Sequence, residues 1–189
     1  MNHHYILVLP LAAALFVTFV FAAILLLRYT QVGPNRVLIV SGRLYQLPDG
    51  TRRGFRIVKG GGTFVLPVIE KAEALSLEVL TIEMPKWKAR TANGASWEGD
   101  CVAQVKIQGD DASIVAAAEH FLSKNEAEMK NLVRPILEKH LRAIVGGLNL
   151  EEISRDLEAC AAGAQAAASG DLANMGLSLV SFTIRPGRF

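Results

Sequence analysis

The chain has 189 residues, of which 51% are hydrophobic, and its formal net charge is +2 at pH 7. A charge so close to zero does not indicate nucleic-acid binding. Its two cysteines, Cys101 and Cys160, are far apart in the sequence and lack the spacing of a metal site or a disulfide framework. In a cytoplasmic domain we expect both to be buried thiols.

The first predicted element is an apolar helix over residues 5–27. Ile6 to Leu27 is a run of 22 residues without a charge, in which only Thr18 has a polar side chain. As a helix this run would be roughly 33 Å long, enough for a hydrocarbon core of about 30 Å. The segment lacks the basic start, short apolar run and cleavage site of a secretory signal peptide. It therefore predicts an uncleaved transmembrane anchor, preceded by a short tail at residues 1–4. The anchor residues expected to contact lipid include Ile6, Leu15, Phe19, Phe21, Leu25 and Leu27.

A basic segment follows the predicted anchor. Residues 28–60 contain seven Lys or Arg residues and one acid, Asp49. By the positive-inside rule, the short N-terminus lies outside the cell membrane and the rest of the chain in the cytoplasm. Two interpretations stay open: the charges contact anionic headgroups, or they only set the topology. The candidates for contact with the membrane surface are Arg28, Arg36, Arg43, Arg56 and Lys59.

The next part of the chain predicts short strands separated by turns. Runs rich in β-branched residues indicate strands at 36–40, 55–58 and 63–66. The turn signals between them are Gly33-Pro34-Asn35, Leu47-Pro48-Asp49-Gly50 and the glycine run Gly60–Gly62. The glycine run lacks the Gly-Lys-Ser/Thr ending of a phosphate loop and precedes a strand, so we interpret it as a turn.

Alternating residues predict two longer strands after these. Over residues 71–84 the alternation slips once, between Val79 and Leu80, which predicts a β-bulge, and Pro85 is expected to end the strand. Asn93-Gly94 is a hairpin-type turn. The strand that follows, Asp100–Gln108, is predicted to place Cys101, Ala103, Val105 and Ile107 on one face.

Three helices and a last strand complete the predicted order. Asp110 or Asp111 can cap the first helix, and Ser123 with Glu126 has the spacing of a capping box for the second. The second helix contains Pro135 and ends at Gly146-Gly147. A third helix is expected from a capping box at Asn149 and Glu152 to Ser169, and a strand over Leu177–Ile184 has a phase change near Val180. The class is therefore α+β.

No combination of residues indicates catalysis. His140 lies on an apolar helix face, which is typical of a hydrogen-bonded boundary residue, and His120 has no partner four residues away. The chain contains no Gly-x-Ser-x-Gly motif and no nucleophile with an evident base. We therefore predict no enzymatic activity, no catalytic residue, no cofactor and no metal site.

Eight segments, in this order, resemble the flotillin branch of the stomatin–prohibitin–flotillin (SPFH, band 7) family. They are Val37–Arg43, Gly54–Phe64, Pro67–Lys71, Leu75–Val79, Leu141–Gly146, Leu150–Ile153, Asp171–Leu177 and Ser181–Ile184. Each segment alone is a weak signal, whereas the ordered set is specific and covers about residues 33–185.

The resemblance implies a band 7 domain, which is a bent antiparallel sheet with flanking helices beside the bilayer. Residues 28–108 would form its strand-rich first part and residues 109–185 its helical second part with the final strand, before a tail at 186–189. It also implies a membrane scaffold that forms homo-oligomers and organises membrane microdomains and neighbouring membrane proteins. No catalytic residue is carried over, because the family has none.

The resemblance also implies partners: membrane lipids, further copies of the chain, and an NfeD-like membrane protein or a membrane protease. In the family a coiled coil follows the last strand, and no heptad pattern occurs here after residue 170, so we expect a truncated or naturally short form. An alternative function stays open, namely a non-assembling regulatory module that binds a membrane protease or full-length flotillin-like proteins.

Overall fold

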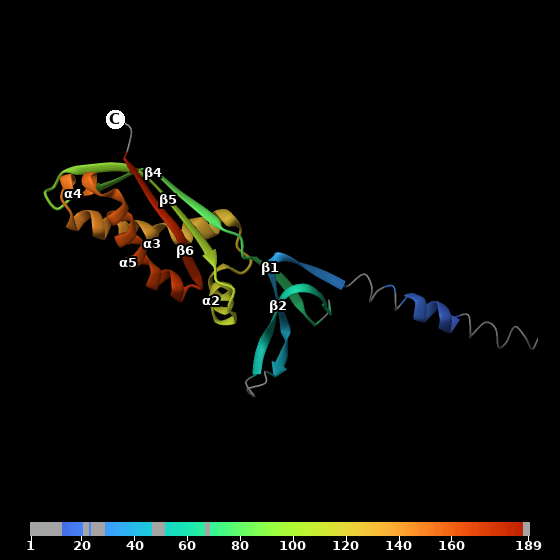
Figure 1. Cartoon of the computed structure of the whole chain (residues 1–189). Helices are drawn as coiled ribbons and strands as arrows, with labels where there is room; N and C mark the ends of the chain where they lie inside the picture. Colours follow the sequence, from blue (N-terminus) through green and yellow to red (C-terminus); the bar gives the residue numbers. More distant parts are fainter. Residues whose placement is uncertain (1–12, 21–22, 24–28, 47–51, 67–68, 187–189) are drawn as a thin grey trace, which may run out of the picture. The chain divides into compact units, whose positions relative to one another are not determined.

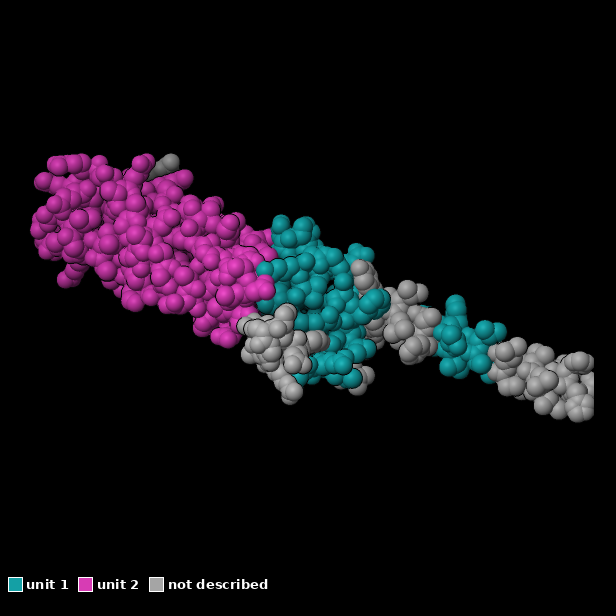
Figure 2. All heavy atoms as spheres, turned by 60° about the horizontal axis from the view of Figure 1, so that its bottom comes forward, with its two compact units in different colours: residues 1–73 teal, residues 74–189 magenta. Residues whose placement is uncertain are grey.

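A computed structural model of the chain describes residues 13–20, 23, 29–46, 52–66 and 69–186. The elements are β1 (Tyr29–Gln46), β2 (Arg52–Phe64), β3 (Lys71–Ser76), β4 (Leu80–Arg90), β5 (Ser96–Ile107), α2 (Asp111–Phe121), α3 (Glu126–Gly147), α4 (Leu150–Arg155), α5 (Leu157–Asn174) and β6 (Leu177–Pro186) (Figure 1). The chain divides into two compact units, residues 1–73 and 74–189 (Figure 2). The predicted α+β class, with antiparallel sheets and helices, is confirmed.

The first sheet has the strand order β2-β1-β3, and β1 and β2 are long antiparallel strands. Their register shifts between Val32 and Val37 of β1, on the stretch that faces Gly60 and Gly61 of β2. Both glycines are left-handed, with φ of +67° and +71°, a conformation that glycine adopts without steric cost. The turns predicted at the Gly33 and Gly60 motifs are therefore wrong: both motifs lie inside strands, at an irregularity that leaves the pairing intact on either side. The turn predicted at residues 47–50 lies outside the described residues.

The slip between Val79 and Leu80 does not mark a bulge within one strand, as the sequence predicted. It marks the point where β3 has ended and β4 begins, and the two strands belong to different sheets. Pro85 does not end β4 either. The register shifts between Met84 and Trp87, so that the bulge falls around Pro85, which cannot donate a hydrogen bond to a neighbouring strand.

The second sheet has the order β4-β5-β6 and is antiparallel throughout. The predicted hairpin turn is confirmed, since the Thr91 N–H donates to the Ala95 carbonyl at 2.9 Å and Gly94 has φ of +78°. Opposite Gln104 and Val105, β6 carries one extra residue, Val180, which confirms the predicted phase change. Strand β5 alternates as predicted, with Cys101, Ala103, Val105 and Ile107 all buried.

Helices α3 and α5 supply much of the rest of this core. The buried side chains of α3 recur every fourth residue: Val133, Leu137, Leu141 and Val145. Helix α3 packs against β4, and α5 packs against both β6 and α3. The buried positions of α5 are mostly small, Cys160, Ala161, Ala164 and Ala168, and small residues let its backbone approach its neighbours closely.

The capping residues agree with the sequence for α2 and differ for α3. Asp110 caps α2 by accepting from the Ser113 N–H at 2.9 Å, as predicted. The capping box of α3 is formed by Asn125 and Glu128, two residues after the predicted pair. The predicted box at Ser123 is wrong because Ser123 has φ of +65°, whereas an N-cap residue has an extended conformation.

The predicted third helix is divided in two. Its start is confirmed, because the Asn149 N–H donates to a carboxylate oxygen of Glu152 at 2.8 Å. The helix is interrupted at Asp156, whose φ of −143° is not helical. Asp156 then caps α5 by accepting from the Ala159 N–H at 2.8 Å, so one acidic residue ends α4 and begins α5.

Candidate membrane-contacting site

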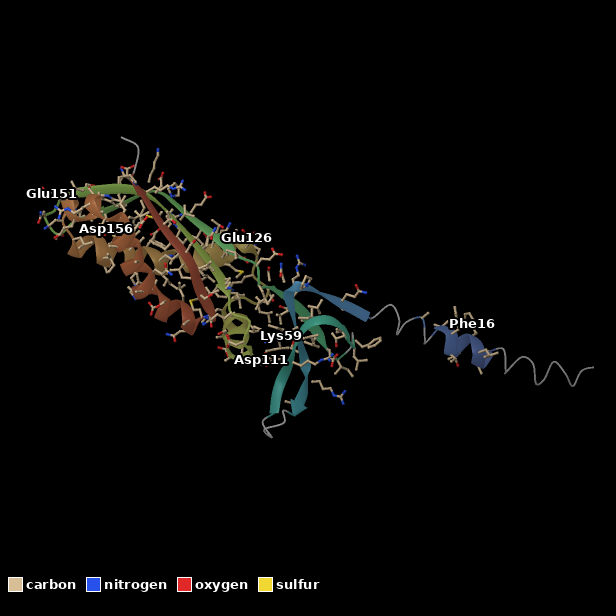
Figure 3. The ribbon with its side chains drawn as sticks, in the orientation of Figure 1. Phe16, Lys59, Asp111, Glu126, Glu151 and Asp156 are labelled. Atoms are coloured by element: carbon tan, nitrogen blue, oxygen red, sulfur yellow. The ribbon has the colours of Figure 1, made fainter. Side chains whose placement is uncertain are left out.

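The apolar N-terminal segment is helical where the structure describes it. Residues 13–20 form a helix, and its side chains at Leu15 and Phe19 are 65% and 72% exposed. Figure 3 shows Phe16 on the same helix. The hydroxyl of Thr18 donates to the Ala14 carbonyl at 2.8 Å, so the segment's polar side chain is satisfied within the helix.

The remaining predicted anchor residues, Ile6, Phe21, Leu25 and Leu27, lie outside the described residues, as does most of the predicted 5–27 span. Within the part of the chain that the structure describes, no helix combines the length and the apolar character needed to cross a bilayer. The single transmembrane span thus stays a prediction.

The basic residues of the first unit divide into two kinds. Arg36 and Arg43 on β1 and Lys59 on β2 have exposed side chains (Figure 3 labels Lys59), as a contact with headgroups requires. Arg56 is half-buried and makes internal contacts instead. Arg28 lies outside the described residues.

Arg56 holds the segment that follows β2. Its guanidinium donates to the Phe64 carbonyl at 2.8 Å and lies 3.7 Å from a carboxylate oxygen of Glu70. Glu70 is only 4% exposed and accepts from the Leu66 N–H at 3.0 Å. A buried carboxylate loses its contacts with water and needs hydrogen bonds or a positive charge in their place. The bonds to Glu70 therefore hold the end of this segment close to its start at Phe64 and Leu66.

A close backbone contact attaches the same segment to β1. Gly42 has φ of +117°, and a Cβ atom built on it would overlap the Ile69 carbonyl oxygen. The hydroxyl of Ser41 also donates to the Lys71 carbonyl at 3.4 Å. Ile69 therefore lies directly against β1, one residue away from the exposed Arg43.

Four large apolar side chains are exposed in this region, and we call them the apolar set. Leu44, Phe64, Leu66 and Ile69 are 70%, 54%, 42% and 58% exposed. Apolar side chains next to exposed Lys and Arg are typical of surfaces that enter the headgroup region of an anionic bilayer. Sequence reasoning missed the apolar set because these residues have the composition of strands, which does not show which side chains of a strand stay exposed.

Three titratable side chains of the second unit form one contact between helices. His140 Nε2 lies 2.8 Å from a carboxylate oxygen of Asp171, and Lys139 Nζ lies 3.3 Å from the same oxygen. These hydrogen bonds, from His140 first and then from Lys139, lower the pKa of Asp171 below its ordinary value. The contact joins α3 to α5 and agrees with the predicted role of His140 as a hydrogen-bonded boundary residue.

The two cysteines are buried, as expected. Burial raises the pKa of the Cys101 thiol to about 12, with smaller contributions from Cys160, Asp100 and Glu138. Burial also raises the pKa of Cys160. A thiol that stays protonated is a poor nucleophile and a poor metal ligand. Among the described residues, no three His, Cys, Asp or Glu side chains form a group that could hold a metal ion.

Comparison with known proteins places these observations in a family. Residues 30–187 match the family described as SPFH domain / Band 7 family. The chain is 36% identical over 187 residues to the flotillin-like protein FloT of Bacillus subtilis, covering 96% of this chain and 36% of FloT. It is 37% identical to Flotillin-1 of Drosophila melanogaster over 158 residues, which covers 83% of this chain and 35% of the relative. Human Flotillin-1 is 38% identical over 154 residues, covering 81% of this chain and 34% of the relative. The chain thus spans about a third of the length of the curated relatives it matches.

Proposed function

The chain belongs to the SPFH domain / Band 7 family and is a flotillin-like member of it, and we propose that it self-associates at a membrane to organise microdomains and neighbouring membrane proteins. Membership of this family of membrane-associated scaffolds supports the proposal. The observation that carries it here is the apolar set next to exposed basic residues.

The energetics of such a surface favour membrane contact. Full burial of one Leu, Ile or Phe side chain stabilises by about 1.5–3 kcal/mol. Each Lys or Arg near an anionic surface adds about 1 kcal/mol. The apolar set offers four such side chains, and Arg36, Arg43 and Lys59 are exposed in the same unit. Even with partial burial, these contributions favour holding the first unit at the surface.

In this proposal the residue 5–27 segment spans the membrane once, with residues 1–4 outside and the SPFH domain in the cytoplasm. The exposed apolar side chains of residues 13–20 and the satisfied Thr18 hydroxyl support this arrangement. The domain acts by binding and not by catalysis, and its partners are lipids, further copies of the chain, and an NfeD-like membrane protein or a membrane protease.

A depth measurement tests the membrane contact. In the full chain reconstituted into vesicles that contain phosphatidylserine, a fluorophore is attached at Ile69→Cys and, as a matched control, at Val180→Cys. Val180 is also apolar and exposed, at 46%, but belongs to the second unit. Brominated lipids should quench the probe at position 69 and not the probe at position 180. Equal quenching at the two positions, or none at position 69, would contradict the proposed contact.

A further inference from the structure

The second unit contains a groove lined by none of the residues proposed to contact the membrane. Its cavity has a volume of about 480 Å³ and is lined by Lys88, Ala89, Arg90, Ser96, Arg142 and Gly146. The first three belong to β4, Ser96 to β5, and the last two to α3. Helix α3 packs against β4, so the groove lies between a strand and a helix. Its volume is within the range of about 300–1,000 Å³ that is usual for binding pockets.

The strand that lines this groove is an edge strand. In the order β4-β5-β6, β4 has β5 as its single neighbour within the described sheet. Its pairing continues beyond the bulge from Trp87–Gly99 to Arg90–Ser96 and into the turn. An edge strand presents a row of backbone donors and acceptors that another chain can pair with.

The hydrogen-bond alternation identifies which backbone groups face outward. The Thr91 N–H donates to the Ala95 carbonyl across the hairpin. In an antiparallel ladder, hydrogen-bonded residues alternate with residues whose N–H and C=O groups point away from the neighbouring strand. Ala89 therefore bonds to β5, whereas the N–H and C=O groups of Lys88 and Arg90 point away from β5. One contact agrees with this assignment: a Cβ atom built on Gly146 of α3 would lie 3.9 Å from the Arg90 carbonyl oxygen. The end of α3 therefore lies beside the outward backbone of Arg90, which leaves Lys88 as the part of the β4 edge for a partner strand.

The groove is also strongly basic. Lys88 pairs with Glu98 at 3.0 Å. The side chains of Arg90 and Arg142 form neither a hydrogen bond nor an ion pair with any residue that the structure describes. Both residues are exposed, so their guanidinium groups are free to donate to a carboxylate in bidentate fashion.

We propose that this groove binds an extended acidic segment of a partner protein, which adds as a strand to the edge of β4 at Lys88 and places its carboxylates at Arg90 and Arg142. The site is separate from the proposed membrane contact. A peptide matches both features of the groove, because its backbone supplies acceptors and donors at strand spacing and its side chains supply the negative charge. A phosphate ion or a lipid headgroup would satisfy the arginines and leave the β4 edge unpaired.

The test uses the full chain in mild detergent at fixed ionic strength, because charged contacts are screened by salt. The probe is a fluorescent peptide of four Thr-Glu repeats with blocked ends, and binding is followed by anisotropy. A carboxylate bond to a charged donor contributes enough to change affinity about tenfold or more. The double variant Arg90→Gln/Arg142→Gln should therefore bind the peptide at least about tenfold more weakly. The matched control, Arg155→Gln, removes an exposed arginine of α4 and should bind as the unchanged chain does.

Two further probes separate strand addition from simple charge attraction. The same peptide with alternate backbone amides methylated keeps its charges but cannot pair with an edge, so it should bind at least about tenfold more weakly. Binding of the parent peptide should also slow hydrogen exchange at the Lys88 amide.

Five results would overturn the proposal. Equal binding of the methylated peptide, or full displacement of the parent peptide by inorganic phosphate, would make the groove a small-anion site. Displacement only by phosphatidylserine vesicles would assign it to a membrane. Loss of self-association in the double variant without any peptide binding would assign it to a second copy. If no peptide binds up to a concentration of about 1 mM, the basic residues would instead serve to prevent the β4 edge from pairing with other chains.

Discussion

Gly42 allows a close backbone approach in the region proposed to contact the membrane. Its φ of +117° is a conformation that residues with a side chain rarely adopt, and the Ile69 carbonyl occupies the space of its missing Cβ. Strain and steric overlap therefore act together at this position, and both oppose any substitution.

We expect Gly42→Ala to lower the free energy of unfolding by more than about 2 kcal/mol. The matched control is Gly54→Ala in β2, where a Cβ atom would meet nothing within 4 Å. That control should be neutral or should stabilise by up to about 1 kcal/mol, because alanine reduces the freedom of the unfolded chain. Urea denaturation of the full chain in detergent measures both, and equal stability of the two variants would contradict the observed packing.

The buried thiols permit a second prediction at this scale. With a pKa of about 12, only about one Cys101 side chain in ten thousand is ionised at pH 8, and Cys160 is shifted in the same direction. A thiol reagent such as DTNB should therefore modify neither cysteine of the folded chain within minutes at pH 8. After denaturation both should react, and rapid modification of the folded chain would show that at least one thiol is accessible.

Among the elements, α3 shows how a single cap sets a boundary. Asn125→Ala removes the side-chain acceptor of the capping box and should destabilise the chain by about 1 kcal/mol. The control is Asn131→Ala, within the same helix, where Asn is exposed and alanine is the better helix former. It should be neutral or stabilising by a few tenths of a kcal/mol. Opposite signs for the two asparagines in thermal melts would support the boundary, and the reverse order would place the helix start elsewhere.

The contact between α3 and α5 makes stability depend on pH. The folded pKa of Asp171 is lowered, first by the hydrogen bond from His140 and then by Lys139, so the folded state favours the ionised carboxylate. Its contribution is complete above the unfolded value of about 3.9 and is lost as pH falls through the lower folded value.

We therefore expect Asp171→Asn to be less stable than the unchanged chain at pH 6. The difference should shrink as pH falls below about 4, because the native carboxylate is then protonated as well. Glu151→Gln on α4 is the control, since Glu151 is exposed and forms no ion pair with any described residue. A stability difference that stays constant down to pH 2 would contradict the role assigned to Asp171.

How far the elements could be predicted depends on whether the deciding interaction is local. The pattern of α3, the cap at Asp110, the Asn93-Gly94 hairpin and the extra residue at Val180 are local features, and the sequence predicts each of them. The glycine run of β2 could not be predicted in the same way, because its role depends on the irregularity in the facing strand β1. The apolar set was missed for a similar reason, since which side chains of a strand stay exposed depends on how the strands pack in three dimensions.

At the scale of the whole molecule, the two units suggest a division of work. Residues 1–73 hold the apolar segment, the exposed basic side chains and the apolar set, which together form the proposed membrane contact. Residues 74–189 form a separate helix-packed sheet with the basic groove, which we propose as the site for a protein partner. A scaffold needs both properties, because it must stay at the membrane and hold other proteins there.

Self-association is the central claim for the whole molecule, and the mass of the full chain in mild detergent tests it most directly. Light scattering combined with negative-stain images should show large, uniform assemblies of many copies, since a scaffold acts through many domains placed side by side. A particle containing one copy, both in detergent and in lipid nanodiscs, would contradict the account.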